Sequence, residues 1–522
     1  MLRKVVTESG ILQGLVGHDP RITEFRGVPY AKPPVGELRW KAPQPVESWE
    51  GIRKCYEYGP MPMMRKHPGT DLSQFYTKEL HPTSAEYEMS EDCLYLNIYS
   101  PAETVDDNLP VLCYIHGGGL QDGYNYEVEF DGERVARRGV IVVMIGYRLG
   151  LFGFLAHPEI TAETPDNQAV SNFGMQDQSF ALHWVARNIK NFGGDPSRIV
   201  VCGQSAGAAS VQCQVCSPKN EGIIAGAICQ SSVSMSFEEE FSIGRYKTLA
   251  EAEKFGEDFF TSIGIKNLAE ARSMDAYELM RRLDNVSPKG VPFGLYFGIC
   301  IDGKFVTETV ARSYFNDRLP DIPMIVGYCL DETKGMFGNK GNTPSYKEFL
   351  EFANVYGDKK DEFLKIANVS DDAGVAELYE RGDFNSISAG SRGFCELRSA
   401  MGKKVYLYIF DHDIPGDDAG SFHGSDLWFT FDSLSKSWRP FEGKHYDLAR
   451  QVCSYWTNFV KFGDPNGDGT DYNGNPLPEW RPYTKNEKNV MMFYDKATPE
   501  TLPENAIIDF RLEFAKDKFT DK

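Results

Sequence analysis

A serine between two glycines, Ser205 in the segment VVCGQSAG (residues 200–207), has the setting of a catalytic nucleophile. The apolar run RIVVC leads into the pattern Gly-x-Ser-x-Gly, and the small residues AGAAS lead out of it into the helical pattern SVQCQV. A strand, a sharp turn and a helix in this order hold a serine hydroxyl on a strained turn beside the N–H groups of the helix start. The pattern alone is weak evidence in a chain with 49 glycines, but its setting predicts a nucleophile for acyl transfer.

A glycine-rich loop, HGGGL (residues 116–120), follows the apolar run VLCYI. Successive glycines leave backbone N–H groups uncovered, and such groups stabilise the oxyanion of a tetrahedral intermediate. In hydrolases with this kind of serine turn, the donors come from the residue after the nucleophile and from such a loop. We therefore predict Gly118, Gly119 and Ala206 as the oxyanion donors; a flexible glycine turn is the alternative.

The general base should be a histidine that follows the serine and the acid, because the chain order in such hydrolases is serine, acid, histidine. Three histidines qualify by position: His412, His423 and His445. The first lies beside an apolar run and the third in a helical pattern, so both fit structural roles better. His423 lies in a loop of small residues, DDAGSFHGSDLWFTF, and a loop can carry an imidazole to a serine. We predict His423 as the base.

The acid should lie at the end of a strand between the serine and the base. The segment IPMIVGYCLDETKGMF offers Asp331 and Glu332 just after its apolar run. Asp302, in ICIDGKF, is a rival, but its Asp-Gly pair is typical of a turn. Either Asp331 or Glu332 could orient an imidazole and stabilise imidazolium, so the residues alone leave this choice open.

These residues need elements that position them, and the chain alternates short apolar runs with helical patterns. The helical segment 177–192 is the clearest, with apolar residues at helical spacing and GGDP after its end. Strands that alternate with helices predict an α/β fold with a mostly parallel, twisted sheet. The predicted strands are 111–115, 140–146, 198–203, 225–230, 322–328 and 404–410.

Composition narrows the class of protein. The formal charge is −20 and the chain has no basic run, which argues against nucleic acid as a partner. The longest apolar run, residues 139–147, is too short to span a bilayer, and the first residues lack the apolar segment of a signal peptide. The eleven cysteines, many within apolar runs, are expected to be buried thiols, so we predict a cytoplasmic protein without a membrane partner.

Several segments, in order, resemble the type-B carboxylesterases, the group that includes cholinesterases and bacterial para-nitrobenzyl esterases. The resemblance implies an α/β-hydrolase fold with helices on both faces of the central sheet and helical insertions, forming one domain over residues 1–522. The matching segments are FRGVPYAKPPVGELRW (25–40), EDCLYLNIYSP (91–101), the long segment around Ser205 (172–207), QSS (230–232), GYCLDE (327–332), FHGSDLWF (422–429) and WTNFVKFGDPN (456–466).

The resemblance also implies roles for single residues. It selects Glu332 as the acid, giving a triad of Ser205, Glu332 and His423, and it gives Ser231 a supporting role near the triad. The family usually has glutamate before the nucleophile, whereas this chain has Gln204. The usual carboxylate is thus lost and a supporting hydrogen bond is expected to differ, while the nucleophile itself is unaffected.

Two other departures from the family concern a disulfide and a ligand. Cys93 lacks the usual partner in the loop before it, so we expect a free thiol. Cholinesterases carry a choline-binding tryptophan where this chain has Thr83, so choline-ester specificity is not expected.

The sequence therefore predicts a serine esterase that acts on a small-molecule ester and needs no cofactor. The same residues serve amide, thioester or lactone cleavage, and a non-catalytic cholinesterase-like binding module is a further alternative. Leu120, Trp428 and Phe429 flank the catalytic loops and are predicted to line the substrate pocket, with core packing as the alternative. No metal site is predicted, because the segment 464–475 has asparagine where a calcium loop needs glutamate. The sequence does not indicate the oligomeric state.

Overall fold

The computed structural model describes residues 1–64, 74–81, 87–232, 237, 247–288, 295–332, 334, 343–383 and 386–521. Its internal contacts divide the chain into two compact units. Unit 1 comprises Met1–Ala227 and Gly244–Thr309, and unit 2 comprises Ile228–Ile243 and Val310–Lys522. Strand β11 (Ile224–Gln230) contains the point at which the chain passes from unit 1 to unit 2.

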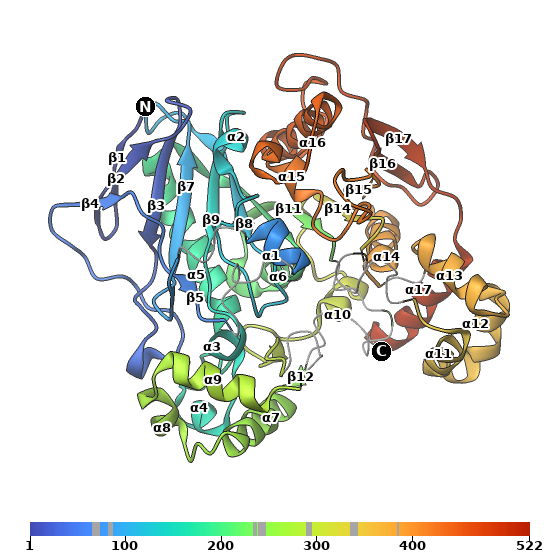
Figure 1. The fold of residues 1–522 in the computed structure, drawn as a ribbon, viewed down its shortest axis with the longest axis horizontal. Helices are drawn as coiled ribbons and strands as arrows, with labels where there is room; N and C mark the ends of the chain where they lie inside the picture. The colour runs from blue at the N-terminus through green and yellow to red at the C-terminus, as the bar shows by residue number, and fades with distance from the viewer. Residues whose placement is uncertain are drawn as a thin grey trace. The chain divides into compact units, whose positions relative to one another are not determined.

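Unit 1 contains a sheet with the strand order β1-β2-β3-β7-β9-β8-β10, and β4 pairs with β2 (Figure 1). Neighbours from β1 to β9 along this order are antiparallel, whereas β9, β8 and β10 are parallel. Two further pairs of short strands, β5 with β6 and β12 with β13, form separate two-stranded sheets. The strands are β1 (Lys4–Thr7), β2 (Gly10–Val16), β3 (Thr23–Pro29), β4 (Ile52–Cys55), β5 (Met61–Pro62), β6 (Met89–Ser90), β7 (Tyr95–Ser100), β8 (Leu109–Ile115), β9 (Ile141–Ile145), β10 (Gly194–Gln204), β12 (Lys247–Thr248) and β13 (Cys300–Ile301).

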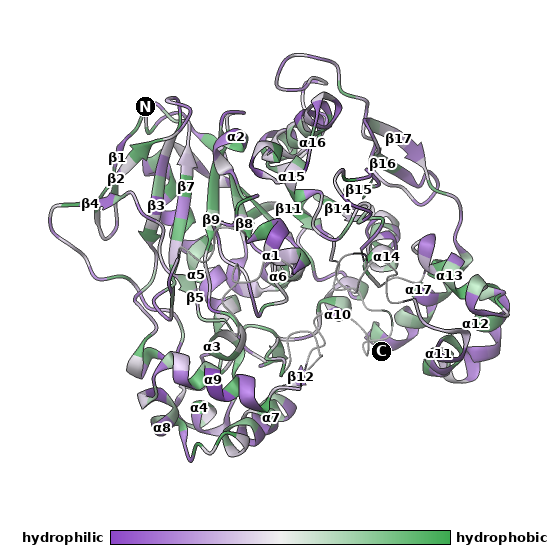
Figure 2. Cartoon of the chain, in the orientation of Figure 1, coloured by the Kyte–Doolittle hydropathy of each residue, from purple (hydrophilic) through white to green (hydrophobic). Residues whose placement is uncertain are grey.

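The parallel strands of unit 1 are buried along their apolar runs. Every residue of β9 is buried, as are the last six residues of β8 and of β10. Figure 2 shows β9 as a hydrophobic strand along its length. A continuous apolar run is what a strand covered on both faces requires, and the runs predicted at 111–115, 140–146 and 198–203 are confirmed as strands.

Helices surround this sheet, and α5 and α6 pack against β10. The helices of unit 1 are α1 (Phe75–Leu80), α2 (Gly132–Ala136), α3 (Gly150–Phe154), α4 (Pro158–Glu163), α5 (Phe173–Asn188), α6 (Ala206–Cys216), α7 (Leu249–Ser262), α8 (Leu268–Ser273) and α9 (Ala276–Val286), with 3-10 turns η1 (Gly36–Leu38), η3 (Ile189–Phe192) and η4 (Pro218–Asn220).

Helix α5 begins four residues before its predicted start. Asn172 precedes it with a left-handed backbone (φ 55°), and its side-chain amide donates to the carbonyl of Cys300 (2.8 Å) while its oxygen accepts the N–H of Cys300 (3.0 Å). Those contacts span more than 120 positions of chain, so no local pattern marks the start. The predicted end is confirmed: η3 continues to Phe192, and Gly193 closes it in a left-handed conformation (φ 84°).

Unit 2 contains the strand order β14-β15-β16-β17, in which the first three strands are parallel and β17 is antiparallel to β16. The strands are β14 (Met324–Cys329), β15 (Val405–Phe410), β16 (Asn489–Phe493) and β17 (Ala497–Thr501). Its helices are α10 (Val310–Phe315), α11 (Tyr346–Phe352), α12 (Lys360–Ala367), α13 (Asp372–Glu380), α14 (Ser386–Ala400), α15 (Leu427–Thr430), α16 (Gly443–Phe462) and α17 (Ala506–Phe519), with 3-10 turns η5 (Ala353–Lys359) and η6 (Leu434–Lys436).

The strands of unit 2 are also buried along their apolar runs. All residues of β14 and β15 are buried, and α14 packs against both strands. The runs predicted at 322–328 and 404–410 are thus confirmed as strands, and the α/β class is confirmed in both units. No helix in the described ranges combines the length and the hydropathy needed to cross a bilayer.

A buried ion pair fastens α5 to the segment after β9. The Arg148 guanidinium donates to both oxygens of Asp177 (2.7 Å each), and the backbone N–H of Arg148 donates to the same carboxylate (3.1 Å). The two side chains are 3% and 0% exposed, so each charge depends on the other for the hydrogen bonds that water would provide.

We predict that Asp177→Asn lowers the free energy of unfolding by about 3–5 kcal/mol, because it leaves a buried guanidinium without its counter-charge. Urea denaturation followed by circular dichroism measures this. The matched control is Glu8→Gln, which breaks the exposed pair of Glu8 with Arg187 and should cost less than about 1 kcal/mol. Equal losses in the two variants would contradict the prediction.

Candidate active site

Ser205 occupies a strained turn between a buried strand and a helix. β10 ends at Gln204 and α6 begins at Ala206, so the serine is the single residue between them. Its backbone has φ 57° and ψ −127°, a conformation that costs a non-glycine residue on the order of 1–3 kcal/mol. The residue is half-buried. Strain of this kind is typical of a functional residue held in place by its surroundings.

The two glycines around the serine are required by the packing of this turn. A Cβ on Gly203 would lie 2.5 Å from the carbonyl carbon of Gly207, and one on Gly207 would lie 2.1 Å from the carbonyl oxygen of Ile115. The strand, the helix and the end of β8 therefore approach each other too closely for any side chain at either position.

The glycine loop lies against this turn. A Cβ on Gly117 would be 3.2 Å from Cβ of Ser205 and 2.8 Å from the carbonyl oxygen of Gln204. Three successive residues, Gly118, Gly119 and Leu120, have positive φ (94°, 62° and 59°). Among the described residues, nothing accepts a hydrogen bond from the N–H groups of Gly118, Gly119 or Ala206. Unit 1 thus holds a strained serine beside backbone donors that are available to an anion.

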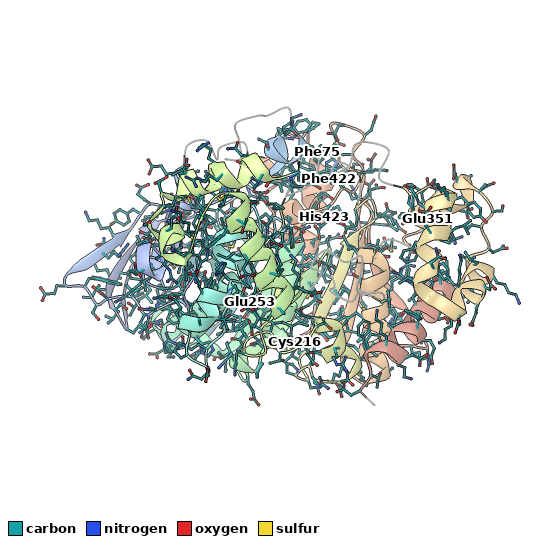
Figure 3. All side chains as sticks on the ribbon, turned by 90° about the horizontal axis from the view of Figure 1, so that it is seen from below. Phe75, Cys216, Glu253, Glu351, Phe422 and His423 are labelled. Carbon is teal, nitrogen blue, oxygen red and sulfur yellow. The ribbon has the colours of Figure 1, made fainter. Side chains whose placement is uncertain are left out.

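A histidine and a carboxylate meet in unit 2. The Glu332 carboxylate contacts Nδ1 of His423 through Oε2, and its other oxygen accepts the N–H of Cys329 (2.8 Å). The contact forms because a backbone bridge joins Asp331 to Phe422, which places the end of β14 beside the loop that carries His423. Figure 3 labels Phe422 and His423 in that loop. Both side chains are buried, at 6% and 1% exposure.

Asp331, the alternative acid in the sequence, contacts Ser421 and Lys334. Its Oδ2 accepts from the N–H (3.1 Å) and the hydroxyl (3.3 Å) of Ser421, and its Oδ1 pairs with Lys334 (2.8 Å). Of the two neighbouring carboxylates, Glu332 is therefore the one that can orient the imidazole. The rival Asp302 forms a turn, with Oδ1 accepting from the N–H groups of three following residues.

The Glu332 carboxylate determines the proton affinity of His423. Burial alone would lower the pKa of this imidazole, because it disfavours the charged form. The negative charge of Glu332 and its hydrogen bond outweigh burial, and Asp426 adds to them, so the pKa of His423 is raised above its ordinary value. A histidine held in this way can take up a proton during a reaction and stabilise it.

Asp426 is a residue that the sequence reasoning missed. It is 1% exposed and lies three positions after His423; its Oδ2 accepts from the hydroxyl of Tyr408 (2.7 Å) and from Nε2 of Gln230 (2.9 Å). Burial raises the pKa of this carboxyl, while the two hydrogen bonds oppose that rise. No sequence signal separates it from the many exposed aspartates of the chain, since only its burial beside the imidazole marks it.

Ser231 lies beside the end of β14, the strand that leads to Glu332. Its backbone is left-handed (φ 52°), its N–H donates to the carbonyl of Gly327 (2.8 Å), and its hydroxyl lies 3.9 Å from Sγ of Cys329. Cys329 in turn donates its N–H to Glu332. Ser231 can therefore act on the acid through the end of β14, and its supporting role stays a prediction.

The other predicted residues are buried. Gln204, Leu120 and Trp428 are at most 5% exposed, and the Phe429 ring packs against Phe410, His412 and Phe441. Their roles in the substrate pocket stay predictions, and Thr83 lies outside the described residues. The rival bases His412 and His445 pack on each other (5.1 Å between ring centres) in unit 2. Cys93 is a buried free thiol, as expected.

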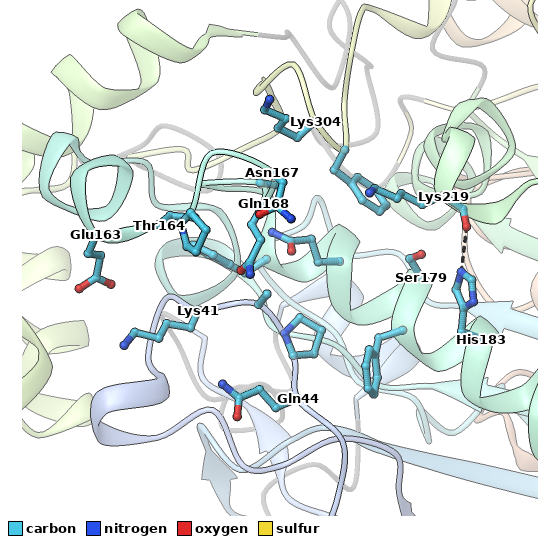
Figure 4. A pocket seen from close by; sticks show the side chains of 18 residues that line it. Lys41, Gln44, Glu163, Thr164, Asn167, Gln168, Ser179, His183, Lys219 and Lys304 are labelled. Atoms are coloured by element: carbon cyan, nitrogen blue, oxygen red, sulfur yellow. Dashed lines mark hydrogen bonds between the residues drawn. The ribbon is translucent and has the colours of Figure 1, made fainter.

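A cavity of about 610 Å³ along α5 contains a second serine and histidine, Ser179 and His183 (Figure 4). They do not form a nucleophile–base pair. The Ser179 hydroxyl donates to Oδ1 of Asn220 (2.7 Å), and Nε2 of His183 bonds to the carbonyl of Lys219 (2.9 Å). None of the residues predicted for the active site lines this cavity. The strained Ser205 therefore stays the predicted nucleophile.

Comparisons with known proteins show the family of the chain. The carboxylesterase family model matches residues 2–510. The chain is 30% identical to the fumonisin B1 esterase of Sphingopyxis macrogoltabida, over 88% of this chain and 82% of that protein. It is also 30% identical to the para-nitrobenzyl esterase of Bacillus subtilis (strain 168), over 96% of each. A solved structure titled thermophylic PNB esterase has a TM-score of 0.80 and 27% identity, covering 98% of this chain and 100% of that one.

We predict that Glu332→Gln lowers the pKa of His423, because burial then acts without the opposing carboxylate charge. Asp331→Asn is the matched control next to it in the chain and should leave that pKa unchanged within about 0.3 units. NMR titration of the His423 C2 proton measures both, with His423→Gln used to assign the signal. A lowered pKa in the Asp331 variant alone would contradict the assignment of the acid.

Proposed function

Because the chain belongs to the carboxylesterase family and is a carboxylic ester hydrolase of the α/β-hydrolase fold, we propose that Ser205, His423 and Glu332 form its catalytic triad. The observation that carries the proposal is the buried contact of His423 with Glu332 in unit 2, together with the strained serine in unit 1. The proposal requires both units to work as one catalytic domain over residues 1–522.

In the first half of the reaction, the Ser205 hydroxyl attacks the ester carbonyl carbon. Nδ1–H of His423 is donated to Glu332, which makes Nε2 the basic nitrogen that takes the serine proton. The oxyanion receives the N–H groups of Gly118, Gly119 and Ala206, and each donor contributes roughly 3 kcal/mol to the transition state. The imidazolium then protonates the alcohol as the bond to it breaks, leaving an acyl-enzyme.

In the second half, a water molecule gives its proton to Nε2 of His423 and attacks the acyl carbon. The same donors stabilise the second oxyanion, and the proton returns to Ser205 as the carboxylic acid leaves. Glu332 stays ionised throughout: it orients the ring and stabilises the imidazolium in both halves. Asp426, whose charge also acts on His423, favours the same protonated state. These steps need no cofactor.

The substrate is a small-molecule ester, and Leu120, Trp428 and Phe429 are proposed to line its pocket. Amide, thioester and lactone bonds remain alternatives, because the same residues serve every acyl transfer to water. The non-catalytic binding module is set aside, since the family and the relatives in the comparison are ester hydrolases. A cytoplasmic location is proposed from the eleven unbridged cysteines.

We predict that Ser205→Ala lowers kcat for a para-nitrophenyl ester by at least about 10⁴-fold, because no nucleophile remains to form the acyl-enzyme. Ser179→Ala, in the cavity along α5, is the matched control and should retain kcat within about threefold. Assays across acyl chains from two to eight carbons show which acyl group is preferred. Turnover that survives in Ser205→Ala and falls in Ser179→Ala would contradict the proposal and place the chemistry in the cavity along α5.

We predict that kcat/KM falls as the pH drops through the raised pKa of His423, because a protonated imidazole cannot accept the serine proton. Glu332→Gln should reduce kcat/KM by up to roughly 10⁴-fold and move this acid limb to lower pH, since it lowers the pKa of the base. Asp331→Asn should keep kcat/KM within about threefold of wild type and leave the acid limb at the same pH. The pH–rate profiles of the three proteins decide; an acid limb that stays in place in Glu332→Gln contradicts the role of Glu332.

A further inference from the structure

The cavity along α5 has the size of a small-molecule site, at about 610 Å³. All of its lining belongs to unit 1. The lining comes from the chain after η1, the end of α4 and the segment that follows it, one side of α5, η4, and the segment after β13. The fold therefore brings segments that are far apart in the sequence together around one recess.

The buried part of the lining is apolar. Phe173 and Phe305 are 1% and 6% exposed, and Ala169 is 9% exposed. Pro43 and Phe180 add half-buried apolar surface. Small-molecule sites are lined mostly by apolar and aromatic side chains, with a few polar groups that fix the orientation of the ligand. This lining can cover an aromatic ring or a short acyl chain.

Three lysines border the same cavity: Lys41, Lys219 and Lys304. The first is half-buried and the other two are exposed. Within the part of the chain that the structure describes, no carboxylate forms an ion pair with any of the three. The chain as a whole has 75 acidic and 55 basic residues, so three unpaired lysines around one recess make it a positive site on an acidic protein.

Two of these lysines lie on neighbouring segments whose backbone is fixed. Nε2 of His183, on α5, bonds to the carbonyl of Lys219 (2.9 Å), as Figure 4 shows. The Ser217 hydroxyl, just before η4, donates to the carbonyl of Phe305 (3.5 Å), which follows Lys304 directly. The segments that carry Lys219 and Lys304 are therefore joined to each other, and the first is also held to α5.

Two acids close to the lysines are bound to other groups. Both oxygens of Glu163 pair with Arg272, and these bonds hold the pKa of Glu163 below its ordinary value. Lys41 adds to this effect through its charge. Asp302 is buried, and its Oδ1 accepts the backbone N–H of Lys304 (2.8 Å). The side-chain ammonium groups at the cavity thus keep the capacity to pair with an added anion.

We propose that this cavity binds a small organic carboxylate, with its anionic end at Lys219 and Lys304 and its apolar body against Phe173 and Phe305. A recess with apolar walls and charges of one sign attracts an ion of the opposite sign more strongly than a flat surface does. None of the residues proposed for the triad or the oxyanion loop lines the cavity, so the site is additional to the one around Ser205.

The class of ligand has a source in the reaction itself. Hydrolysis of a carboxylic ester releases a carboxylic acid, which is ionised near pH 7 because carboxyl groups have ordinary pKa values near 4. The proposed ligands therefore include the product that the enzyme forms. This last point rests on the ester hydrolysis described above, whereas the binding itself does not.

The test is a calorimetric titration with 4-phenylbutyrate, which carries one carboxylate and one aromatic ring. Ser205 is first blocked with a fluorophosphonate, so that binding around the catalytic serine is not counted. The neutral probe 4-phenylbutanamide has the same shape without the charge. We expect one molecule of 4-phenylbutyrate to bind, and the amide to bind at least about tenfold more weakly, because it cannot pair with the lysines.

The variants Lys219→Met and Lys304→Met remove the charge and keep an unbranched side chain. We expect each to weaken binding of 4-phenylbutyrate at least about threefold, and the double variant at least about tenfold. Binding of the amide should stay within about twofold. Lys254→Met is the matched control, because Lys254 is an exposed lysine of unit 1 that pairs with Asp258 on α7, outside the cavity, and it should bind 4-phenylbutyrate as wild type does. Unfolding temperatures show that each variant is folded.

Each outcome decides the proposal. A preference for the carboxylate over the amide that is lost in the double variant and kept in Lys254→Met supports it. Equal affinities for the two probes, an unchanged affinity in the double variant, or no binding at about 20 mM 4-phenylbutyrate overturns it. Failure of the triad would appear separately, as turnover that survives Ser205→Ala, and would leave the comparison among the lysine variants intact.

Discussion

The proposed catalysis depends on a carboxylate held against an imidazole inside a buried site. Either group alone would be costly to bury when charged, and burial would leave His423 with a lowered pKa. Glu332 reverses that effect, because its charge and hydrogen bond act at contact distance where little water screens them. Its other oxygen is fixed by the Cys329 N–H, so the acid cannot turn away from the ring. A base that is both oriented and raised in proton affinity is what a serine hydroxyl needs.

The proposed nucleophile and the proposed acid are each held within their own unit, and by the same physical means. In each, a buried parallel strand ends at a sharp, tightly packed segment that presents a reactive group: β10 presents Ser205, and β14 leads to Glu332. Rigid strands fix the position of the loops that follow them, and those loops carry the chemistry. The strain at Ser205 and the close packing of Gly203 and Gly207 show that this position is determined by its surroundings.

Much of this arrangement could be predicted from the sequence because it is local. Apolar runs located the buried strands, and the predicted strand, turn and helix around Ser205 are those of the structure. The choice between Asp331 and Glu332 was not local: it depends on the bridge between Asp331 and Phe422, and only the family resemblance favoured Glu332. Asp426 gave no signal, since an acid that will be buried looks the same in a sequence as an exposed one. The start of α5 was missed because Asn172 is held by Cys300, far along the chain.

The most direct measurement of the central claim is covalent labelling of the serine by a fluorophosphonate, with the modified peptide identified by mass spectrometry. The account predicts one label, on Ser205, at a rate that falls at least about 100-fold in His423→Gln, because the unassisted hydroxyl is a poor nucleophile. A label on another residue, or equal labelling rates in the two proteins, would show that His423 does not activate Ser205 and would contradict the account.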